Sequence, residues 1–145
     1  MSIRQLSIFV ENTPGQFARA TSVLEQAKVS IRGFALSDTG QFGIARLVVD
    51  NPDLAAEALS AAGYTVKFTE VLCVELIDHP GELNRVANIL QKADVNIEYA
   101  YSMMGTFVVC KVYDLEAAKK RLDGHPVRLV SQDDIMAFSV DEVGE

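Results

Sequence analysis

One stretch of this sequence occurs twice, and the repeat restricts the possible folds more than any other feature. Residues 11–31 align without a gap to residues 77–97, and 7 of the 21 aligned pairs are identical. The most recognisable shared element is a Pro-Gly corner, written TPGQF in the first copy and HPGEL in the second. Such a match indicates an internal duplication. The chain of 145 residues should therefore consist of two similar units.

Each copy shows the same succession of hydrophobic patterns. Alternating apolar residues at 6–10 and 72–76 predict a strand with one buried face. After the corner, apolar or small residues recur at helical spacing over 17–27 and 83–93, as on an amphipathic helix. Each copy continues with a strand, a turn, a strand, a helix and a short closing strand. The expected segments are 29–37, 42–50, 52–63 and 64–68 in the first copy, and 95–103, 106–114, 115–124 and 127–131 in the second.

The predicted order βαββαβ, written twice, corresponds to an α+β fold of two tandem ferredoxin-like units. Each unit is expected to be an antiparallel sheet with its helices on one face. We place the two domains at 1–68 and 69–145. The same spacing of 66 residues leads from the strand at 70–76 to an apolar segment at 136–142. We expect this segment to be a third copy of the first strand, paired beside a first-strand position at a sheet edge.

Composition excludes several classes of function. The formal net charge of −7 argues against nonspecific nucleic-acid binding, which needs a basic surface. Cys73 and Cys110 lie in apolar, strand-like segments without the spacing of a zinc site or a disulfide scaffold. No apolar run of 18 residues and no secretory signal is present, so we expect a cytoplasmic protein with no membrane contact. Units of about 70 residues have small cores, so they should pack on each other or on a second chain.

The repeated corner has the chemistry of a ligand site. A Pro-Gly turn at a helix entrance leaves backbone N–H groups without intrahelical partners, close to the positive end of the helix dipole. Gly15 and Gly81 carry no Cβ, so a carboxylate can approach the backbone closely. Asn12 and Asp78 can accept hydrogen bonds from an ammonium group. These groups together match the head group of a free amino acid. Alternatively, Asn12 and Asp78 are caps or turn formers, and the corner is purely structural.

Catalytic machinery is not recognisable in the sequence. The two histidines, His79 and His125, lie in a turn and in a loop, and no motif for metal hydrolysis, acyl transfer or phosphate binding occurs. The adjacent acids at 133–134 are interpreted as solvated charges. We therefore predict no catalytic residue, no metal site and no cofactor. An enzyme whose active residues meet only at an oligomer interface remains a less favoured alternative.

The two corners and their continuation resemble those of a known family. NTPGQF and DHPGEL are similar to the D/N-x-P-G-x-L signature of ACT domains, and VSI and VNI after the first helix resemble the usual next strand. The resemblance covers nearly the whole chain as two tandem copies. It implies regulatory domains that bind small ligands, most often amino acids, and that work in pairs. In such pairs the sheets commonly join edge to edge, and the ligand lies where one corner faces the second strand of the other domain.

The resemblance implies two ligand sites that differ in detail. The second corner carries Asp78 where the first carries Asn12, so the two affinities should differ and one site can be empty. His79 is interpreted mainly as a surface residue and alternatively as a ligand contact. The ligand-binding residues predicted in this way are Asn12, Pro14, Gly15, Gln16, Phe17, Ser30 and Ile31 in the first copy, and Asp78, His79, Gly81, Glu82, Leu83, Asn96 and Ile97 in the second.

The function predicted by the resemblance is that of a stand-alone, non-catalytic regulatory protein that binds an amino acid-like ligand at domain interfaces. Because open sheet edges favour association, a homodimer is expected. The alternative is a regulatory subunit that docks on a metabolic enzyme, with weak or vestigial ligand sites. A patch of aromatic residues and methionines leading into the second hairpin is interpreted as packing, or alternatively as a pocket wall. Its members are Tyr99, Tyr101, Met103 and Met104.

Overall fold

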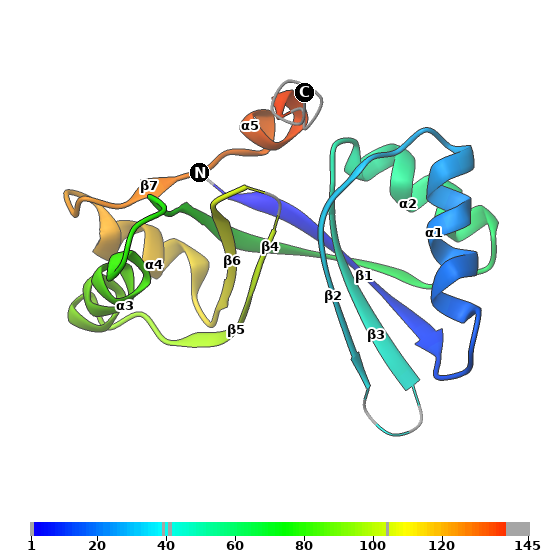
Figure 1. Cartoon of the computed structure of the whole chain (residues 1–145), viewed down its shortest axis with the longest axis horizontal. Coiled ribbons are helices and arrows are strands. Elements are labelled where there is room, and N and C mark those ends of the chain that lie inside the picture. Colours follow the sequence, from blue (N-terminus) through cyan, green and yellow to red (C-terminus); the bar gives the residue numbers. More distant parts are fainter. Residues whose placement is uncertain (1, 39, 41, 104, 139–145) are drawn as a thin grey trace.

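The computed structural model describes residues 2–38, 40, 42–103 and 105–138 and shows two βαββαβ units that share one long strand (Figure 1). This arrangement confirms the α+β, tandem ferredoxin-like fold expected from the repeat. The first unit contains β1 (Ile3–Glu11), α1 (Gln16–Gln26), β2 (Ile31–Asp38), β3 (Phe42–Val49) and α2 (Pro52–Ala61). The shared strand is β4 (Val66–Glu75). The second unit adds α3 (Glu82–Lys92), β5 (Ile97–Ser102), β6 (Phe107–Val112), α4 (Leu115–Leu122) and β7 (Arg128–Leu129), and α5 (Gln132–Ala137) follows.

The shared strand joins both units into one sheet. Among the described residues the strand order is β2-β3-β1-β4-β6-β5, and β7 also pairs with β4. The first part of β4 pairs antiparallel with β1, from Ile3↔Val71 to Ile8↔Val66. Its last residues pair instead with β6 and β7. Strand β4 is thus the last strand of the first unit and the first strand of the second. The domain limit predicted between 68 and 69 falls inside this continuous strand and stays a prediction.

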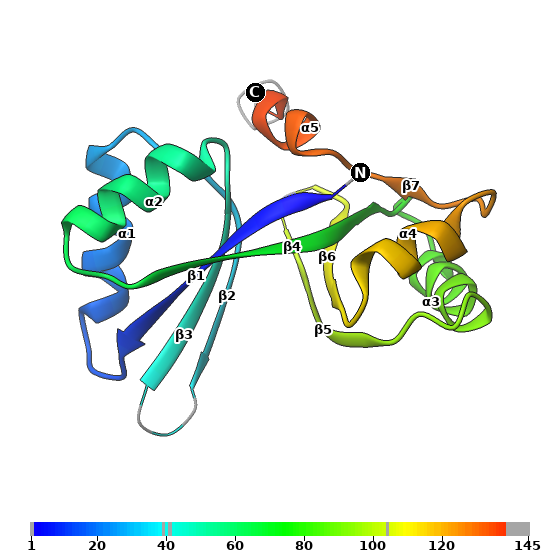
Figure 2. The same cartoon turned by 180° about the vertical axis from the view of Figure 1, so that it is seen from behind.

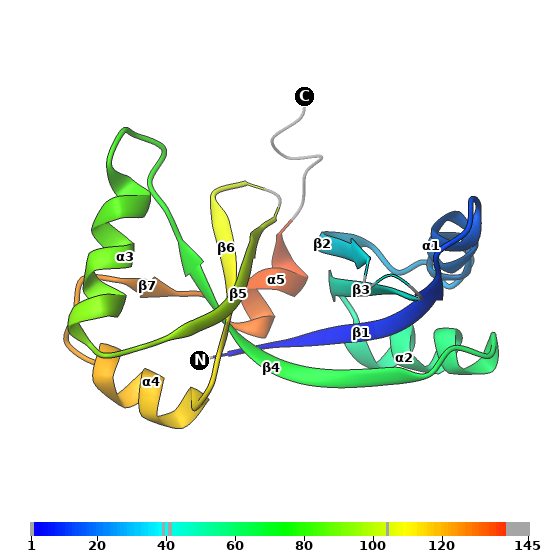
Figure 3. The same ribbon diagram turned by 90° about the horizontal axis from the view of Figure 1, so that it is seen from below.

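Each unit has its own apolar core beneath its helices. Helices α1 and α2 lie at one end of the molecule and α3 and α4 at the other, with the sheet between the two pairs (Figure 3). In the first unit Leu6, Ile8 and Leu47 of the sheet pack against α1 and α2. In the second unit Leu72, Val74 and Val112 pack against α3 and α4. The alternation read from the sequence therefore identifies the helix-facing side of each sheet correctly.

A third core holds the two units together. It lies on the sheet surface away from the four outer helices, and α5 lies between the units there (Figure 2). Buried Gln5 on β1 donates to the Tyr99 hydroxyl at 2.7 Å and accepts from the Tyr101 hydroxyl at 2.7 Å. The guanidinium of Arg46 on β3 lies 4.1 Å from the centre of the Tyr99 ring. The apolar members of this core are Ile3, Val48, Val71, Cys73, Met103, Val109, Val130 and Ile135. Tyr101 and Met103 pack in or against this core and Tyr99 contacts Gln5 and Arg46, while Met103 also lines a cavity; Met104 lies outside the described residues.

The predicted third copy of the first strand is wrong where the structure describes it. Residues 136 and 137 belong to α5, and 139–142 lie outside the described residues. Local sequence starts this helix: the Ser131 hydroxyl accepts from the Asp134 N–H at 3.2 Å, and the Asp134 carboxylate accepts from the Ser131 N–H at 3.0 Å. In addition, β1 already has a partner strand on each side, so its edges are occupied. Within the described chain, no helix combines the length and apolar character needed to cross a membrane.

Candidate functional site

The two Pro-Gly corners have the same backbone geometry. Gly15 (φ 88°) and Gly81 (φ 89°) are the N-caps of α1 and α3 in the left-handed conformation, which glycine adopts without strain. Neither helix has a side-chain cap, so Asn12 and Asp78 do not act as caps. A Cβ at either glycine would meet nothing within 4 Å, so both backbones are accessible. Pro14 and Pro80 each lie immediately before the N-cap, next to the first helical turn.

The first corner borders a small open cavity. Its volume is about 230 Å³, and both the corner and the neighbouring hairpin line it. The Asn12 amide donates to the Asp38 carboxylate at 2.9 Å, and the Gly40 N–H donates to the same carboxylate at 2.8 Å. These bonds hold two oxygen acceptors, the Asn12 carbonyl and the Asp38 carboxylate, next to the start of α1. The lining residues are Val10, Glu11, Asn12, Thr13, Phe17, Leu36, Ser37, Asp38 and Gly43.

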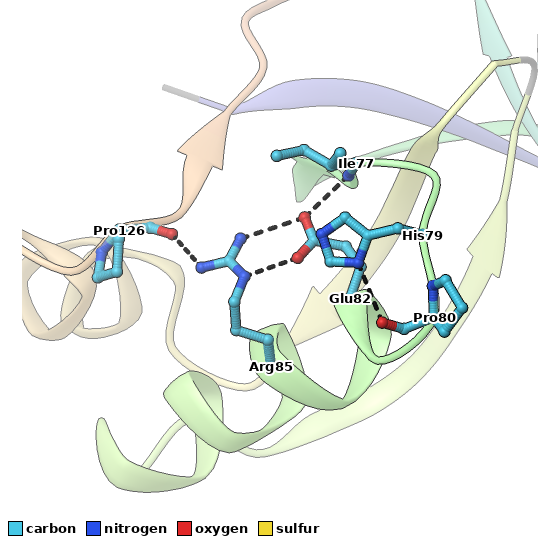
Figure 4. A network of polar contacts seen from close by, with 6 residues as sticks. All are labelled: Ile77, His79, Pro80, Glu82, Arg85 and Pro126. Atoms are coloured by element: carbon cyan, nitrogen blue, oxygen red, sulfur yellow. Dashed lines mark hydrogen bonds and ion pairs between the residues drawn. The ribbon is translucent and has the colours of Figure 1, made fainter.

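The second corner is occupied by a side chain of the protein itself. Figure 4 shows the Glu82 carboxylate between the backbone of Ile77 and the guanidinium of Arg85. The carboxylate accepts from the Ile77 N–H at 2.8 Å and from the Arg85 Nε at 2.6 Å. Arg85 also donates to the Pro126 carbonyl at 2.7 Å. Only 3% of Glu82 is exposed. A backbone donor at this corner is therefore already bound to an internal carboxylate.

Electrostatics favour the charged form of this carboxyl group. The hydrogen bonds from Arg85 and then from the Ile77 N–H lower the pKa of Glu82 from 4.5 to about 2. Glu82 is thus ionised throughout the physiological pH range. Next to it the His79 ring lies at the surface, with Nδ1 3.0 Å from the Pro80 carbonyl oxygen.

The remaining predicted residues are distributed over several places. Ser30 follows the far end of α1, where its N–H donates to the Asp50 carboxylate at 2.9 Å. Asn96 and Ile97 line an open groove between α3 and β5. Leu83 is 61% exposed on the first turn of α3. The structure of this single chain does not bring Ser30, Asn96 or Ile97 together with the corners.

Phe17 and Ile31 meet in a second, larger cavity that both units line. Its volume is about 400 Å³, and it lies between α1, β2 and the end of β5. Phe17 thus faces the end of the other unit's second strand, as the resemblance implies for a corner residue. The lining residues are Phe17, Thr21, Ile31, Arg32, Gly33, Phe34, Ser102 and Met103.

Sequence reasoning missed Asp38 and the residues that line the larger cavity. Asp38 lies in the turn expected between the segments 29–37 and 42–50, and its acidic side chain is the signal that could have marked it. Its place beside Asn12 depends on the pairing of β1 with β3, a long-range contact without a local sequence pattern. The approach of Met103 to Gly33 likewise depends on how the sheet brings the two units together.

Other types of site find no support in the described part of the chain. No group of three or more His, Cys, Asp or Glu side chains there is arranged to hold a metal ion. Cys73 and Cys110 are buried free thiols. Burial raises the pKa of Cys110 to about 11, so this thiol stays protonated.

Comparison with known proteins points to one family. The model of the family described as ACT domain pair matches residues 1–142. Protein BT0572 from Bacteroides thetaiotaomicron is 30% identical, with a TM-score of 0.88 over 95% of this chain and 98% of that chain. The ligand-free regulatory subunit of aspartate kinase from Thermus thermophilus shares the fold at 16% identity, with a TM-score of 0.60 over 82% of this chain and 87% of that chain. A comparison with curated protein sequences finds no significant match.

Proposed function

Because this chain belongs to the family of ACT domain pairs, we propose that it is a non-catalytic regulatory protein whose first corner binds a free amino acid. One observation supports the proposal: an open cavity is lined by Thr13 just before the corner and by Phe17 in the first turn of α1, together with the side-chain oxygens of Asn12 and Asp38. A free amino acid needs hydrogen-bond donors for its carboxylate and, close to them, acceptors for its ammonium group. The first corner offers both on one side of one cavity.

The ammonium group is assigned to the oxygens of Asn12 and Asp38. Asp38 is oriented by two hydrogen bonds, so its carboxylate is held in place before the ligand arrives. The ligand carboxylate is assigned to the N–H groups of the first turn of α1 beyond Gln16, whose own N–H donates to the Thr13 carbonyl at 3.3 Å; the helix dipole is positive there. Phe17 and Leu36 offer an apolar wall to the ligand side chain. With about 230 Å³ available, the cavity suits a small ligand.

The second corner is proposed to be a weak or vestigial site. Its Glu82 carboxylate is held beside the start of α3 by the Ile77 N–H, so it would repel a ligand carboxylate at this corner. A ligand must displace an ion pair with Arg85 before it can bind there. We accordingly expect one amino acid per chain.

Thermal unfolding in the presence of each of the twenty amino acids tests this proposal. One or a few should raise the melting temperature, and Asn12→Ala or Gly15→Val should remove the shift. Asp78→Ala and Gly81→Val are the matched controls at the second corner, and both should keep it. A flat response to all twenty, or a shift that only the second-corner variants remove, would contradict the assignment.

Regulation is proposed to act through association. The strands at the two ends of the sheet, β2 and β5, have a free edge among the described strands. Phe34 and Leu36 on β2 are 55% and 50% exposed, which favours pairing of two chains as a homodimer. A ligand that prefers one arrangement of the units shifts that equilibrium by its differential affinity. Analytical ultracentrifugation with and without the ligand measures both the dimer and the shift.

A further inference from the structure

The first unit has an exposed apolar patch on the sheet face that is turned away from α1 and α2. This aromatic patch consists of Phe9 on β1 and of Phe42 and Ile44 on β3. We propose that it is an interface at which a second copy of the chain packs with its own aromatic patch, one sheet face against the other. The contact is separate from the edge pairing of β2, and it does not depend on amino-acid binding at the first corner.

The strand register fixes the side of the sheet to which the patch points. Ile8 and Val10, the neighbours of Phe9 along β1, are buried beneath the helices. Because successive side chains of a strand point to opposite faces, Phe9 points away from the helices. Ile44 is its direct partner on β3 and therefore lies on the same face. The rings of Phe9 and Phe42 lie 6.3 Å apart in an edge-to-face contact, so the three side chains form one surface.

Much of this apolar surface is accessible in the single chain. The exposed fraction is 59% for Phe9 and 50% for Phe42, and Ile44 is half-buried. Two side chains on the same face nearer to the start of β1, Ile3 and Gln5, are already buried in the core between the units. The aromatic patch thus continues an internal contact surface beyond the point where the second unit covers it. Contiguous exposed apolar side chains of this kind mark an interaction site.

Charged side chains lie on both sides of the aromatic patch, with opposite sign. Glu11 follows Phe9 by two residues along β1. Ser7 precedes it by two residues and is paired with Arg46 on β3 and with Lys67 on β4. Since a strand advances about 3.3 Å per residue, the acid and the two cations lie at nearly equal distances from Phe9, about 7 Å along the strand. Turned end to end, such a surface is complementary to itself.

The second unit selects the same orientation. Its Tyr99 lies over this sheet face, where it contacts Gln5 and Arg46, so the second unit stands beyond the cationic end of the patch (Figure 3). A two-fold axis that crosses β1 at right angles near Phe9 points the second unit of the partner towards the opposite end, past Glu11. It also brings Glu11 of each copy to the cations of the other. An axis parallel to β1 would instead bring acid to acid and one second unit against the other.

Sedimentation equilibrium of the wild type, Leu36→Glu, Phe9→Glu and the double variant tests the interface. Leu36→Glu changes a similarly exposed residue on the opposite face, where edge pairing of β2 is proposed, so this protein should still form a dimer through the aromatic patch. Adding Phe9→Glu places two carboxylates close to the two-fold axis and should convert that dimer into a monomer. Phe9→Glu alone should halve the mass of the wild type. Because Phe9 is largely exposed, the variants should fold, and circular dichroism and thermal unfolding check this.

Charge reversal tests the orientation. Glu11→Lys and Lys67→Glu should each weaken association about tenfold, because each replaces two attractive contacts of the symmetric dimer by repulsive ones. In the double variant these two positions again carry opposite charges across the interface, so its loss should be far smaller than the two single losses combined. Glu70→Lys, on the opposite face of β4, is the matched control and should leave the dissociation constant unchanged.

Three results would overturn the proposal. The first is wild-type or Leu36→Glu protein that stays monomeric at every concentration, which would leave the aromatic patch to a partner other than this chain. The second is a double variant of Phe9→Glu and Leu36→Glu that has the mass of Leu36→Glu alone. The third is additive losses from Glu11→Lys and Lys67→Glu, which would exclude the two-fold arrangement. Thermal shifts with amino acids report on the first corner separately from these masses.

Discussion

The first and second corners have the same backbone geometry, but their side chains differ in how accessible they leave the corner to a ligand. Gly15 and Gly81 have nearly equal φ angles, and in both helices the first intrahelical hydrogen bond is 2.9 Å long. At the next position, however, the first corner has the amide Gln16 and the second has the carboxylate Glu82. The first adjoins a cavity, and the second is filled by its own anion. The duplicated corners have thus kept one backbone geometry, while the change from Gln16 to Glu82 alters whether the corner is accessible to a ligand.

The lengths of the strands explain why Glu82 finds a backbone partner. In the first unit β1 pairs with β3 as far as Glu11↔Phe42. In the second unit β4 pairs with β6 only as far as Glu75↔Phe107, and position 75 corresponds to 9 in the repeat. Counted back from the corner, the strand pairing of the second unit therefore ends two residues earlier than that of the first. The N–H of Ile77, left outside this ladder, is bound by Glu82.

Arg19 and Arg85 lie three positions after Gln16 and Glu82. Both anchor their helix to a later segment of the same unit, and Arg85 in addition pairs with a corner carboxylate. Arg19 donates to the Ala62 carbonyl at 3.1 Å and to the Tyr64 hydroxyl at 2.8 Å, which ties α1 to the segment before β4. Arg85 donates to the Pro126 carbonyl at 2.7 Å in the corresponding segment of the second unit. Only Arg85 also pairs with a carboxylate at its corner. The identity of the two arginines in the repeat therefore reflects the helix anchor.

Exchanging the corner side chains should have the largest effect. Gln16→Glu places an anion beside the amides assigned to the ligand carboxylate, so binding of the most stabilising amino acid should weaken about a hundredfold through like-charge repulsion. Titration calorimetry measures this change. The matched variant Glu82→Gln should leave the first-corner affinity unchanged. Equal losses in both variants would show that the corners are not separate sites.

The polar contact between the units should contribute the next largest effect. Gln5 is fully buried, whereas the repeat has Val71 at the corresponding position. Gln5→Leu should lower the free energy of unfolding by about 2 kcal/mol, because the hydroxyls of two half-buried tyrosines lose their partner. Urea denaturation measures the loss. Adding Tyr99→Phe and Tyr101→Phe should recover part of it, and an unchanged stability of Gln5→Leu would refute the role of this contact.

Acid should weaken the second corner more than the first. The folded-state pKa of Glu82 is about 2, below its ordinary value of 4.5, so the unfolded chain binds the proton more tightly. The contribution of Glu82 is therefore complete above pH 4.5 and is lost as the pH falls towards 2. Urea unfolding at several pH values should show a steeper loss for the wild type than for Glu82→Gln. Parallel curves would exclude an effect of Glu82, and Gln16→Ala provides a control without a titrating group.

The N-caps of the second helices are alike in both units, so we expect their removal to have equal and smaller effects on stability. Asn51 accepts from the Leu54 N–H at 3.2 Å and Asp114 from the Ala117 N–H at 3.1 Å, as N-caps of the second helix in each unit. Asn51→Ala and Asp114→Ala should each lower the free energy of unfolding by about 1 kcal/mol. Thermal unfolding measures both. A clear difference between them would show that asymmetry extends beyond the corners.

Local features of the fold could be predicted because each rests on neighbouring residues. The strands around Leu6 and Leu72 and the helices around Leu24 and Leu90 follow from periodicities of two and about 3.6 residues. The strand predicted from 136, which the structure contradicts at 136 and 137, has the same origin. The 66-residue spacing suggested a strand, but the capping box at Ser131 and Asp134 begins a helix there.

The sequence by itself determines the duplication, the order of strands and helices, and the accessible glycine corners. Short-range sterics and hydrophobic periodicity produce these features. The acceptor that completes the first corner and the pocket between the units follow from contacts between distant segments. Asp38 reaches Asn12, and Met103 reaches Gly33, only after the strands have paired. Strand pairing depends on packing across the whole sheet, and no short stretch of sequence encodes it.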